Sequence, residues 1–222
     1  MIPAPSPKFK NPRARFNFQG RTVSITGVGS YVPARVLTNH ELEKMVDTSD
    51  EWITTRTGVK ERRIAAKDEF TSDLGAKAAQ RAMKMAGVTA DQIDLIVLAT
   101  CTPDMPFPST ACLVQQKIGA RRAAAFDLEA ACAGFIYGLE IGQQFIMSRT
   151  YDTVLVIGAE KLSSITNWKD RNTCVLFGDG AGAVILQSRP QSHGLLTAVM
   201  GAVGSKSDLL KLPAGGSRCP AS

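Results

Sequence analysis

Short apolar runs rich in β-branched residues alternate with amphipathic segments along this chain, and this alternation limits the possible folds most. LIVLATC (95–101) and TVLVIGAE (153–160) are almost continuously apolar, which is typical of strands buried on both faces. Similar patterns predict three helices, at 72–86, 110–118 and 134–148, and three more strands, at 22–29, 123–129 and 177–187. Alternating strands and helices predict an α/β fold with a parallel or mixed sheet covered on both faces.

Side chains that cap helices mark several helix ends. Three pairs have the spacing of a capping box: Thr38 with Glu41, Thr48 with Glu51, and Thr89 with Gln92. Each pair predicts a helical turn directly after its threonine. Ser109 is expected to cap the helix at 110–118, and Gly87 and Gly119 are expected to end the helices before them.

Composition divides the chain into three parts. Residues 1–21 begin with a proline-rich stretch whose four basic residues and no acids supply most of the net charge of +6, and we expect a disordered extension. Residues 22–188 are expected to form one domain, and residues 189–222 the start of a connection to a further half. The rest of the chain contains no basic patch interleaved with aromatic residues, and this argues against nucleic-acid binding. The longest apolar run is too short to span a membrane.

The five cysteines predict free thiols. No CxxC motif occurs and only two histidines are present, so we expect no metal site. Free thiols are typical of a reducing compartment, and we expect a cytoplasmic protein. Cys101, Cys112 and Cys174 are expected in the core and Cys219 in an exposed loop.

Cys132 lies among small residues in EAACAGF (129–135), where a strand is expected to lead into a helix. Ligands of open α/β sheets bind at the carboxyl ends of strands, and a helix N-terminus favours a thiolate. The backbone N–H of Cys132 could also face an oxyanion forming at an attacked carbonyl. These features make Cys132 a candidate acyl-accepting nucleophile; the alternative is a small buried side chain.

Five motifs in order resemble β-ketoacyl-acyl-carrier-protein synthase III. The motifs are GVGSYVP (27–33), DTSDEWITTRTGVKERR (47–63), FPSTAC (107–112), EAACAGF (129–135) and FGDGAGAVIL (177–186). The resemblance implies a thiolase-like layered α/β fold with a mixed sheet, of which this chain covers the N-terminal two-thirds, the second half of the pseudo-duplicated fold being largely missing.

The resemblance also implies an activity. Enzymes of this family are acyltransferases that begin fatty-acid synthesis. A cysteine takes an acyl group from acyl-CoA, and malonyl-acyl-carrier-protein then condenses with it and loses CO₂. The resemblance implies acetyl-CoA as the primer. The implied substrates and partners are acyl-CoA, malonyl-acyl-carrier-protein and a second copy of the chain, with no cofactor beyond acyl-CoA as substrate.

The motifs match family residues one by one. Cys132 matches the acylated cysteine. Trp52, Arg56 and Arg171 match residues that hold the adenine end of CoA, and Thr48 matches the threonine before that tryptophan. Phe107 matches an aromatic residue that reaches the partner's acyl pocket, and Phe177 lies where the family lines its own pocket. The segment of Arg171 reads DRNT instead of DRGT, so Asn172 departs from the family pattern.

Each match has an alternative explanation. Trp52 and Arg56 lie one helical turn apart, and the arginine stem could simply cover a half-buried tryptophan. Phe107 could plug its loop into the core. The glycines at 178, 180 and 182 lack a following P-loop lysine and are better explained as a tight turn than as a phosphate site.

The family also uses a histidine and an asparagine that polarise the malonyl thioester, and neither His40 nor His193 matches. We therefore expect a truncated chain that does not complete the condensation. Two alternatives remain: a non-catalytic remnant of the fold, and a related condensing enzyme of secondary metabolism. A cysteine protease is disfavoured because no histidine has a recognisable catalytic context.

Overall fold

The computed structural model describes residues 21–190 and 194–220 of the chain. Of the extension expected at residues 1–21, residues 1–20 lie outside the described residues, as does His193, whereas Arg21 is the first residue of β1. The strands are β1 Arg21–Tyr31, β2 Arg35–Thr38, β3 Glu61–Ile64, β4 Leu95–Ala99, β5 Ala124–Leu128, β6 Thr153–Lys161 and β7 Asp179–Pro190. The α-helices are α1 Asn39–Leu42, α2 Asp50–Thr57, α3 Thr71–Ala86, α4 Thr110–Ile118, α5 Gly134–Met147 and α6 Arg171–Cys174. Short 3₁₀ turns are η1 Ala90–Gln92, η2 Ala131–Ala133, η3 Leu162–Ser164 and η4 Gly204–Lys206.

The main sheet is mixed, as the sequence predicts. Its strand order is β1-β7-β6-β4-β5. β6, β4 and β5 run parallel, whereas β7 is antiparallel to both β6 and β1. β4 and β6, in the middle of the sheet, are almost entirely buried over their apolar residues because helices cover both of their faces.

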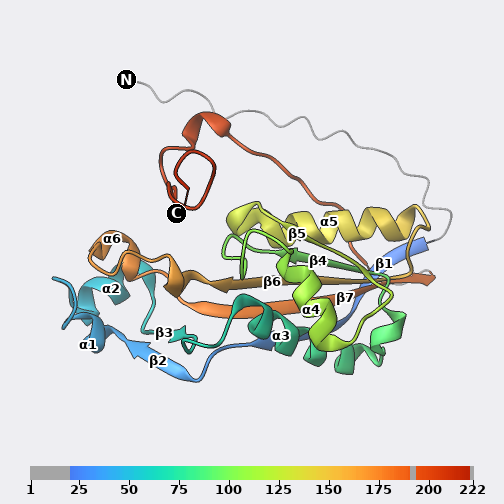
Figure 1. The fold of residues 1–222 in the computed structure, drawn as a ribbon, viewed down its shortest axis with the longest axis horizontal. Coiled ribbons are helices and arrows are strands. Elements are labelled where there is room, and N and C mark those ends of the chain that lie inside the picture. The colour runs from blue at the N-terminus through green and yellow to red at the C-terminus, as the bar shows by residue number, and fades with distance from the viewer. Residues whose placement is uncertain (1–20, 191–193, 221–222) are drawn as a thin grey trace.

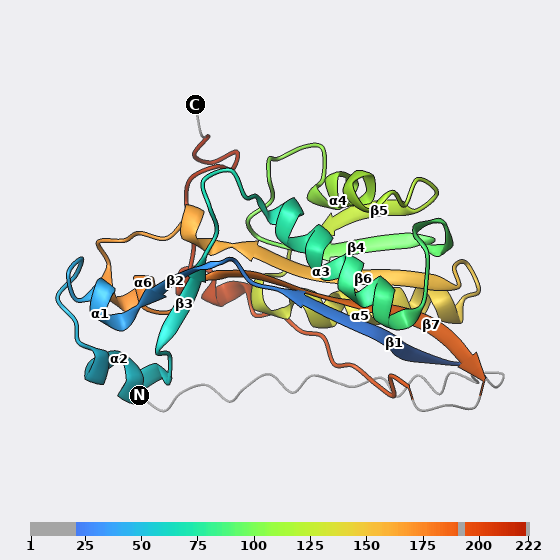
Figure 2. The same cartoon turned by 90° about the horizontal axis from the view of Figure 1, so that it is seen from below.

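Helices lie on both faces of this sheet. Figure 1 shows α5 on one side and α3 with α4 on the other, and Figure 2 shows α3 crossing β1 and β7. Two apolar clusters correspond to the two faces: one includes Leu98, Ile157 and Ala78 of α3, and the other Val97 and Ile146 of α5. Together they form the three-layered α/β arrangement that the alternating sequence predicts.

α5 packs on the sheet through a row of glycines. Gly134, Gly138 and Gly142 recur every four residues and therefore share one face of the helix. A Cβ atom built on each would lie 2.9 Å from an atom of β4, β6 or β7, respectively Ala99 Cβ, Val156 Cγ1 and Leu186 Cδ1. Only glycine lets the helix backbone approach the sheet this closely, so the row sets the height of α5 above the strands.

A small lobe extends from one end of the sheet. It consists of the β2–β3 ribbon with α1, α2 and α6, on the left in Figures 1 and 2. Its core joins residues that are distant in sequence, including Leu37, Ile53 and Cys174. β6 leads through η3 into α6, and β7 returns from it, so the lobe is attached where β6 ends and β7 begins.

Most predicted helix ends are confirmed, and one is wrong. Thr38 caps α1 and forms a reciprocal pair with Glu41, whose Oε2 accepts the Thr38 N–H at 2.9 Å. α2 starts one residue later than predicted: its cap is Ser49, not Thr48, and the Ser49 hydroxyl accepts the Trp52 N–H at 3.0 Å. The predicted ends are confirmed elsewhere: Ser109 caps α4, Gln92 accepts the Thr89 N–H, and Gly87 and Gly119 end their helices with left-handed backbone.

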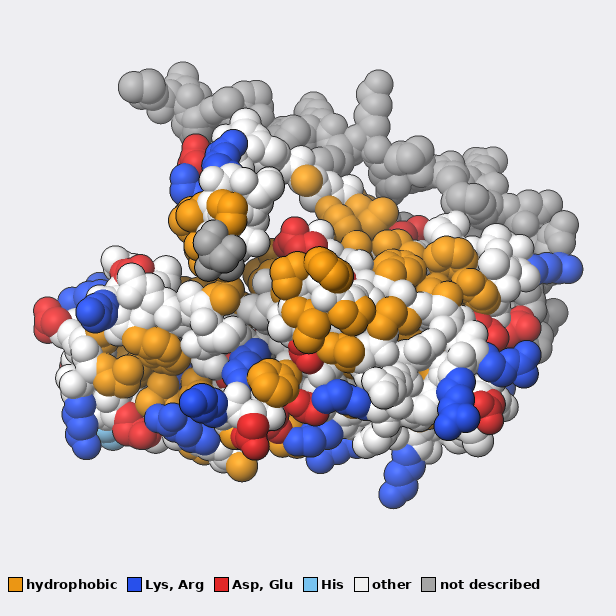
Figure 3. All heavy atoms as spheres, in the orientation of Figure 1, with side chains coloured by type: hydrophobic (Ala, Val, Ile, Leu, Met, Phe, Trp, Pro, Cys, Tyr) orange, Lys and Arg blue, Asp and Glu red, His pale blue; other side chains and the backbone are white. Residues whose placement is uncertain are grey.

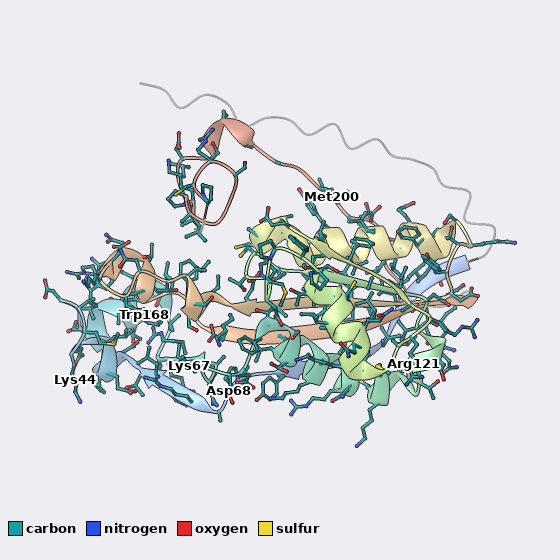
Figure 4. All side chains as sticks on the ribbon, viewed as in Figure 1. Lys44, Lys67, Asp68, Arg121, Trp168 and Met200 are labelled. Carbon is teal, nitrogen blue, oxygen red and sulfur yellow. The ribbon has the colours of Figure 1, made fainter. Side chains whose placement is uncertain are left out.

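Residues 194–201 lie along the outer side of α5, and the rest of the segment, to residue 220, turns away from the helix with little regular structure (Figure 1). The Tyr137 hydroxyl donates to the Gly201 carbonyl at 2.8 Å, and the Gln143 amide donates to the Leu195 carbonyl at 3.0 Å. Met200 lies above α5 in Figure 4, and Figure 3 shows hydrophobic side chains gathered over this part of the molecule. Leu196, Leu209 and Leu210 are at least 70% exposed, so this segment covers α5 only loosely.

Gly29 provides a test of the packing between β1 and α3. A Cβ at Gly29 would lie 2.2 Å from the Ala78 carbonyl oxygen and 2.4 Å from the Ala82 nitrogen, both backbone atoms that cannot move independently. Gly29→Ala should therefore lower the free energy of unfolding by about 1–3 kcal/mol in urea titrations. Gly182→Ala is the matched control on β7, where a Cβ meets nothing within 4 Å. Equal stability of the two variants would contradict this packing.

Candidate active site

Cys132 lies at the carboxyl end of the parallel strands. The chain leaves β5 at Leu128 and makes the η2 turn, which contains Cys132, before α5 begins at Gly134. The Thr100 N–H donates to the Leu128 carbonyl at 3.1 Å, so the ends of β4 and β5 are joined beside this turn. The Cys132 side chain is exposed, which removes the alternative of a small buried side chain. The three strands end on the side of the sheet that carries the small lobe (Figure 1).

The backbone before Cys132 has an unusual conformation. Ala131 has φ of 44°, in the left-handed region that alanine rarely adopts. Such a conformation costs about 1–3 kcal/mol and persists where the surrounding structure enforces it. Here the enforcing contact is α5, whose first residue, Gly134, packs against Ala99. The strained turn presents Cys132 to solvent directly before the helix N-terminus.

Glu160 binds the end of β4 next to this turn. Its Oε1 accepts the Cys101 N–H at 2.9 Å and the Cys101 thiol at 3.4 Å. Its Oε2 accepts the hydroxyls of Thr102 at 2.5 Å and Thr100 at 3.2 Å. Burial and the neighbouring Glu160 carboxylate raise the pKa of the Cys101 thiol to about 12. Cys101 is therefore protonated and unreactive at neutral pH, although it lies close to the Cys132 turn.

The other cysteines differ partly from the sequence expectation. All five are free. Cys174 is buried and Cys219 exposed, as expected, but Cys101 and Cys112 are only partly buried because both lie at the margin of the sheet, outside the apolar clusters. Burial raises the pKa of the Cys174 thiol as well. Among the cysteines of the sheet's carboxyl edge, Cys132 alone is exposed.

Phe107 projects from the loop between β4 and α4. It is 83% exposed, so the alternative that it plugs the core is wrong. Asp104 anchors the loop by accepting the Ser72 N–H at 2.8 Å and the Ser72 hydroxyl at 2.6 Å. Asp127 of β5 accepts the N–H groups at the start of α4, each at 2.7 Å. A well-anchored loop that exposes an aromatic ring suits contact with another molecule.

Two guanidinium groups lie over the Trp52 ring in the small lobe. Arg56 Cζ is 4.5 Å and Arg171 Cζ 4.4 Å from the ring centroid, both within cation–π range. We call Trp52, Arg56 and Arg171 the tryptophan clamp. The two arginines come from α2 and α6, which are more than a hundred residues apart. Asn172 does not remove Arg171 from the ring: it lies exposed on α6, and its N–H donates to the Asp170 side chain at 3.0 Å.

The clamp leaves polar groups unpartnered. Among the described residues, Thr48 Oγ1 and Arg171 Nε are buried atoms without a hydrogen-bond partner. Arg171 Nη1 forms an ion pair with Asp47 Oδ2 at 3.5 Å, and the Asp47 side chain is fully exposed. Such a pair contributes about 0–1 kcal/mol, so Arg171 can leave it at little cost. Trp52, Arg56 and Arg171 are thus brought together in the lobe, and Thr48 lies in the segment directly before α2.

The remaining predicted residues are placed separately. Phe177 is partly buried between α6 and β7, where the lobe joins the sheet. Cys132 and Phe107 belong to the main domain. Sequence reasoning missed the residues that support these groups. Asp127 could have been found in the sequence, because it is an acidic residue within an otherwise apolar strand. Nothing in the local sequence indicated that Glu160 accepts hydrogen bonds from the end of β4.

The comparisons with known proteins agree with this geometry. The family 3-Oxoacyl-[acyl-carrier-protein (ACP)] synthase III matches residues 126–204. A beta-ketoacyl-[acyl-carrier-protein] synthase III of Symbiobacterium thermophilum is 61% identical over 202 residues, which make up 91% of this chain and 61% of that protein. The chain therefore spans about three-fifths of the length of the curated relatives it matches.

Solved structures show the same fold. The 3-oxoacyl-(acyl carrier protein) synthase III of Pseudomonas aeruginosa PAO1 has a TM-score of 0.83 and 41% identity, covering 88% of this chain and 62% of that one. The priming beta-ketosynthase of the R1128 polyketide biosynthetic pathway has a TM-score of 0.75 and 39% identity, covering 78% of this chain and 52% of that one. The chain has the thiolase-like α/β fold that the motifs predict.

The raised pKa of Cys101 gives a pH-dependent test. Because Glu160 raises this pKa, Glu160→Gln should lower it and bring alkylation of Cys101 by iodoacetamide to lower pH. The measurement is mass-spectrometric mapping of label across a pH series, in a Cys132→Ser background. Glu129→Gln is the control, since its carboxylate is a weaker cause of the same shift, and Cys174 should stay unlabelled. An unchanged pH dependence in Glu160→Gln would contradict the assignment.

Proposed function

The chain belongs to the β-ketoacyl-acyl-carrier-protein synthase III family, and we propose that it takes part in the condensation that begins fatty-acid synthesis. In this reaction an acyl-CoA primer, acetyl-CoA in the simplest case, acylates Cys132, and malonyl-acyl-carrier-protein then reacts with the acyl group and loses CO₂. The observation that carries the proposal is the exposed Cys132 on a strained turn before α5, at the carboxyl end of parallel strands.

Acyl transfer uses groups that are local to this turn. The Cys132 thiolate attacks the thioester carbonyl, a bond forms from its sulfur to the carbonyl carbon, and the carbon–sulfur bond to CoA breaks. The proton lost by the Cys132 thiol ends on the CoA thiol. We assign the Cys132 backbone N–H as a donor to the oxyanion formed on the way, because helix N-termini direct N–H groups at developing negative charge.

We assign the tryptophan clamp to the adenine end of CoA. The Trp52 ring and the guanidinium groups offer flat faces on which a purine can stack. Arg171 contacts the Trp52 ring and forms a weak pair with Asp47, so it can shift to admit a purine and then cover it. The unpartnered Thr48 hydroxyl and Arg171 Nε are then available as hydrogen-bond groups for the nucleotide.

The second half of the reaction involves groups beyond those matched here. The family's histidine and asparagine have no match in this sequence, and His40 lies exposed on α1. We therefore assign to this chain the acyl-accepting and CoA-binding parts of the reaction. Phe177 is assigned to the wall of the acyl pocket. Phe107 is assigned to contact with a second subunit of a homodimer, which its exposure supports.

The compartment follows from the same chemistry. No helix among residues 21–190 and 194–220 has both the length and the apolar character needed to cross a bilayer. Fatty-acid synthesis from soluble thioesters and five free cysteines both suit the cytoplasm, where we place the protein.

A related condensing enzyme of secondary metabolism is the second candidate. It is supported by the 39% identity to a priming β-ketosynthase of a polyketide pathway. The two functions differ in the acyl group accepted, so acylation rates across a series of acyl-CoA chain lengths separate them. A clear preference for acetyl-CoA would favour fatty-acid initiation.

The acyl-accepting role predicts which residue acquires an acyl group. After incubation with acetyl-CoA, intact-mass spectrometry should show one added acetyl group, and peptide mapping should place it on Cys132. Cys132→Ser should abolish it, whereas Cys219→Ser, which removes the other exposed thiol, should not. Acetyl label on Cys101, Cys112 or Cys174 in place of Cys132 would overturn the assignment.

The clamp predicts a separation of binding from chemistry. Replacing both Arg56 and Arg171 by Ala should raise the KM for acyl-CoA roughly ten-fold, because two cation–π contacts are lost. The acylation rate at saturating substrate should stay nearly constant, since neither group touches the reacting carbonyl. The double variant Arg121→Ala, Arg122→Ala is the matched control: both side chains are exposed, and Arg121, the immediate neighbour of Arg122, lies far from the lobe (Figure 4). An unchanged KM in the clamp variant would contradict this role.

A further inference from the structure

The tryptophan clamp is assembled from two helices, and a buried arginine connects them. Arg62 lies on β3 and is only 5% exposed, beneath the apolar core of the small lobe. Its pairing partner in the ribbon is Leu37, whose carbonyl accepts from Arg62 Nη1 at 3.4 Å. Its remaining contacts run in two directions, toward α2 and toward α6.

Toward α2, Arg62 acts through Asn39. Arg62 Nη1 donates to Asn39 Oδ1 at 2.7 Å, which turns the Asn39 amide nitrogen toward α2. That nitrogen donates to Asp50 Oδ1 at 2.8 Å, where α2 begins, and to the Val59 carbonyl at 2.8 Å, just after α2 ends. Asn39 is 1% exposed, so water does not compete for these bonds. Arg62 thereby sets the position of the helix that carries Trp52 and Arg56.

Toward α6, Arg62 acts directly. Arg62 Nη2 donates to the Val175 carbonyl at 2.7 Å, at the residue that ends α6. The chain then passes close over β3, because a Cβ at Gly178 would lie 2.9 Å from Arg62 Cβ. One guanidinium group therefore fixes the position of α6, the helix that carries Arg171, relative to α2.

Stability alone does not account for this arginine. Within the described part of the chain no carboxylate forms an ion pair with Arg62, and its Nε is buried without a partner. Burial lowers the pKa of its guanidinium, which reflects the cost of the desolvated charge. Apolar residues of similar volume often stabilise a core as well as a buried charge does. What the guanidinium adds is a rigid planar fork that holds two elements at a set spacing.

We propose that Arg62 is a positioning residue for nucleotide recognition: it sets the spacing between Trp52 on α2 and Arg171 on α6, so that the clamp admits a purine. The inference rests on the proposed function, since it requires that the clamp binds the adenine end of CoA. Thioesters that lack the nucleotide gain nothing from this spacing. Arg62 thus selects CoA-bound substrates over carriers with only the pantetheine arm.

The test uses a tryptophan reporter within the clamp. The chain has two tryptophans, so Trp168→Phe leaves Trp52 as the single fluorophore. The parent, Arg62→Lys and Arg62→Met are titrated with CoA by Trp52 fluorescence, and with both CoA and phosphopantetheine by isothermal titration calorimetry, which detects binding outside the clamp as well. Arg63→Lys and Arg63→Met are the matched controls on the neighbouring, part-exposed arginine. Thermal melting shows which variants are folded, and Arg62→Lys keeps the charge if Arg62→Met does not fold.

In Arg62→Lys, affinity for CoA should fall roughly ten-fold, because one ammonium cannot serve both Asn39 and Val175 and leaves a buried acceptor unpaired. Affinity for phosphopantetheine should not change, and both Arg63 variants should match the parent. An equal loss for both ligands would show a general structural role and overturn the inference, as would unchanged CoA affinity. A parent whose Trp52 fluorescence does not respond to CoA would instead refute the proposed nucleotide site.

Discussion

The close contact between α5 and the sheet is the constraint on which the site depends. Gly134, Gly138 and Gly142 let the helix backbone lie directly on β4, β6 and β7. The first of these contacts, Gly134 on Ala99, places the start of α5 at the end of β4. The chain must then connect the end of β5 to the start of α5 within a few residues, and the left-handed backbone conformation of Ala131 makes this connection possible. The exposed position of Cys132 is a consequence of that path.

The main domain and the small lobe are stabilised by different interactions. The main domain is a layered apolar core in which β4 and β6 are buried from both sides. The lobe combines a smaller apolar cluster with a polar network of Arg62, Asn39 and Asp50. Directional hydrogen bonds define positions more narrowly than apolar contacts do, which suits a lobe that must hold the clamp groups at a set spacing. β6 and β7 lead into and out of the lobe, which lies at the end of the sheet where Cys132 is found (Figure 1).

Acidic side chains give the neighbouring cysteines different reactivities. Cys101 and Cys132 follow adjacent parallel strands, yet only Cys101 lies against a carboxylate and is partly buried. Glu160 keeps the Cys101 thiol protonated while its other bonds hold the end of β4. An electrophile at this edge of the sheet therefore encounters one exposed thiol, that of Cys132. Glu160 thus has two effects: it holds the end of β4 in place, and together with burial it raises the pKa of the Cys101 thiol.

The sequence by itself determined the order and type of the main-sheet strands and of the helices that cover them, because apolar periodicity, capping side chains and terminal glycines act within a few residues. It did not predict the β2–β3 ribbon or α6, which belong to the small lobe. It placed the helices at 72–86 and 110–118 within one residue of α3 and α4, and it singled out Cys132 from the small residues around it. Its one misplaced helix start, at Thr48 in place of Ser49, arose because adjacent hydroxyl residues offer equivalent caps. Only the tertiary structure decided that Arg56 and Arg171 share the Trp52 ring, that Glu160 restrains Cys101, and that Arg62 is buried. These contacts join residues up to about 120 positions apart, and their partners are chosen by the packing of strands and helices, which no local pattern encodes.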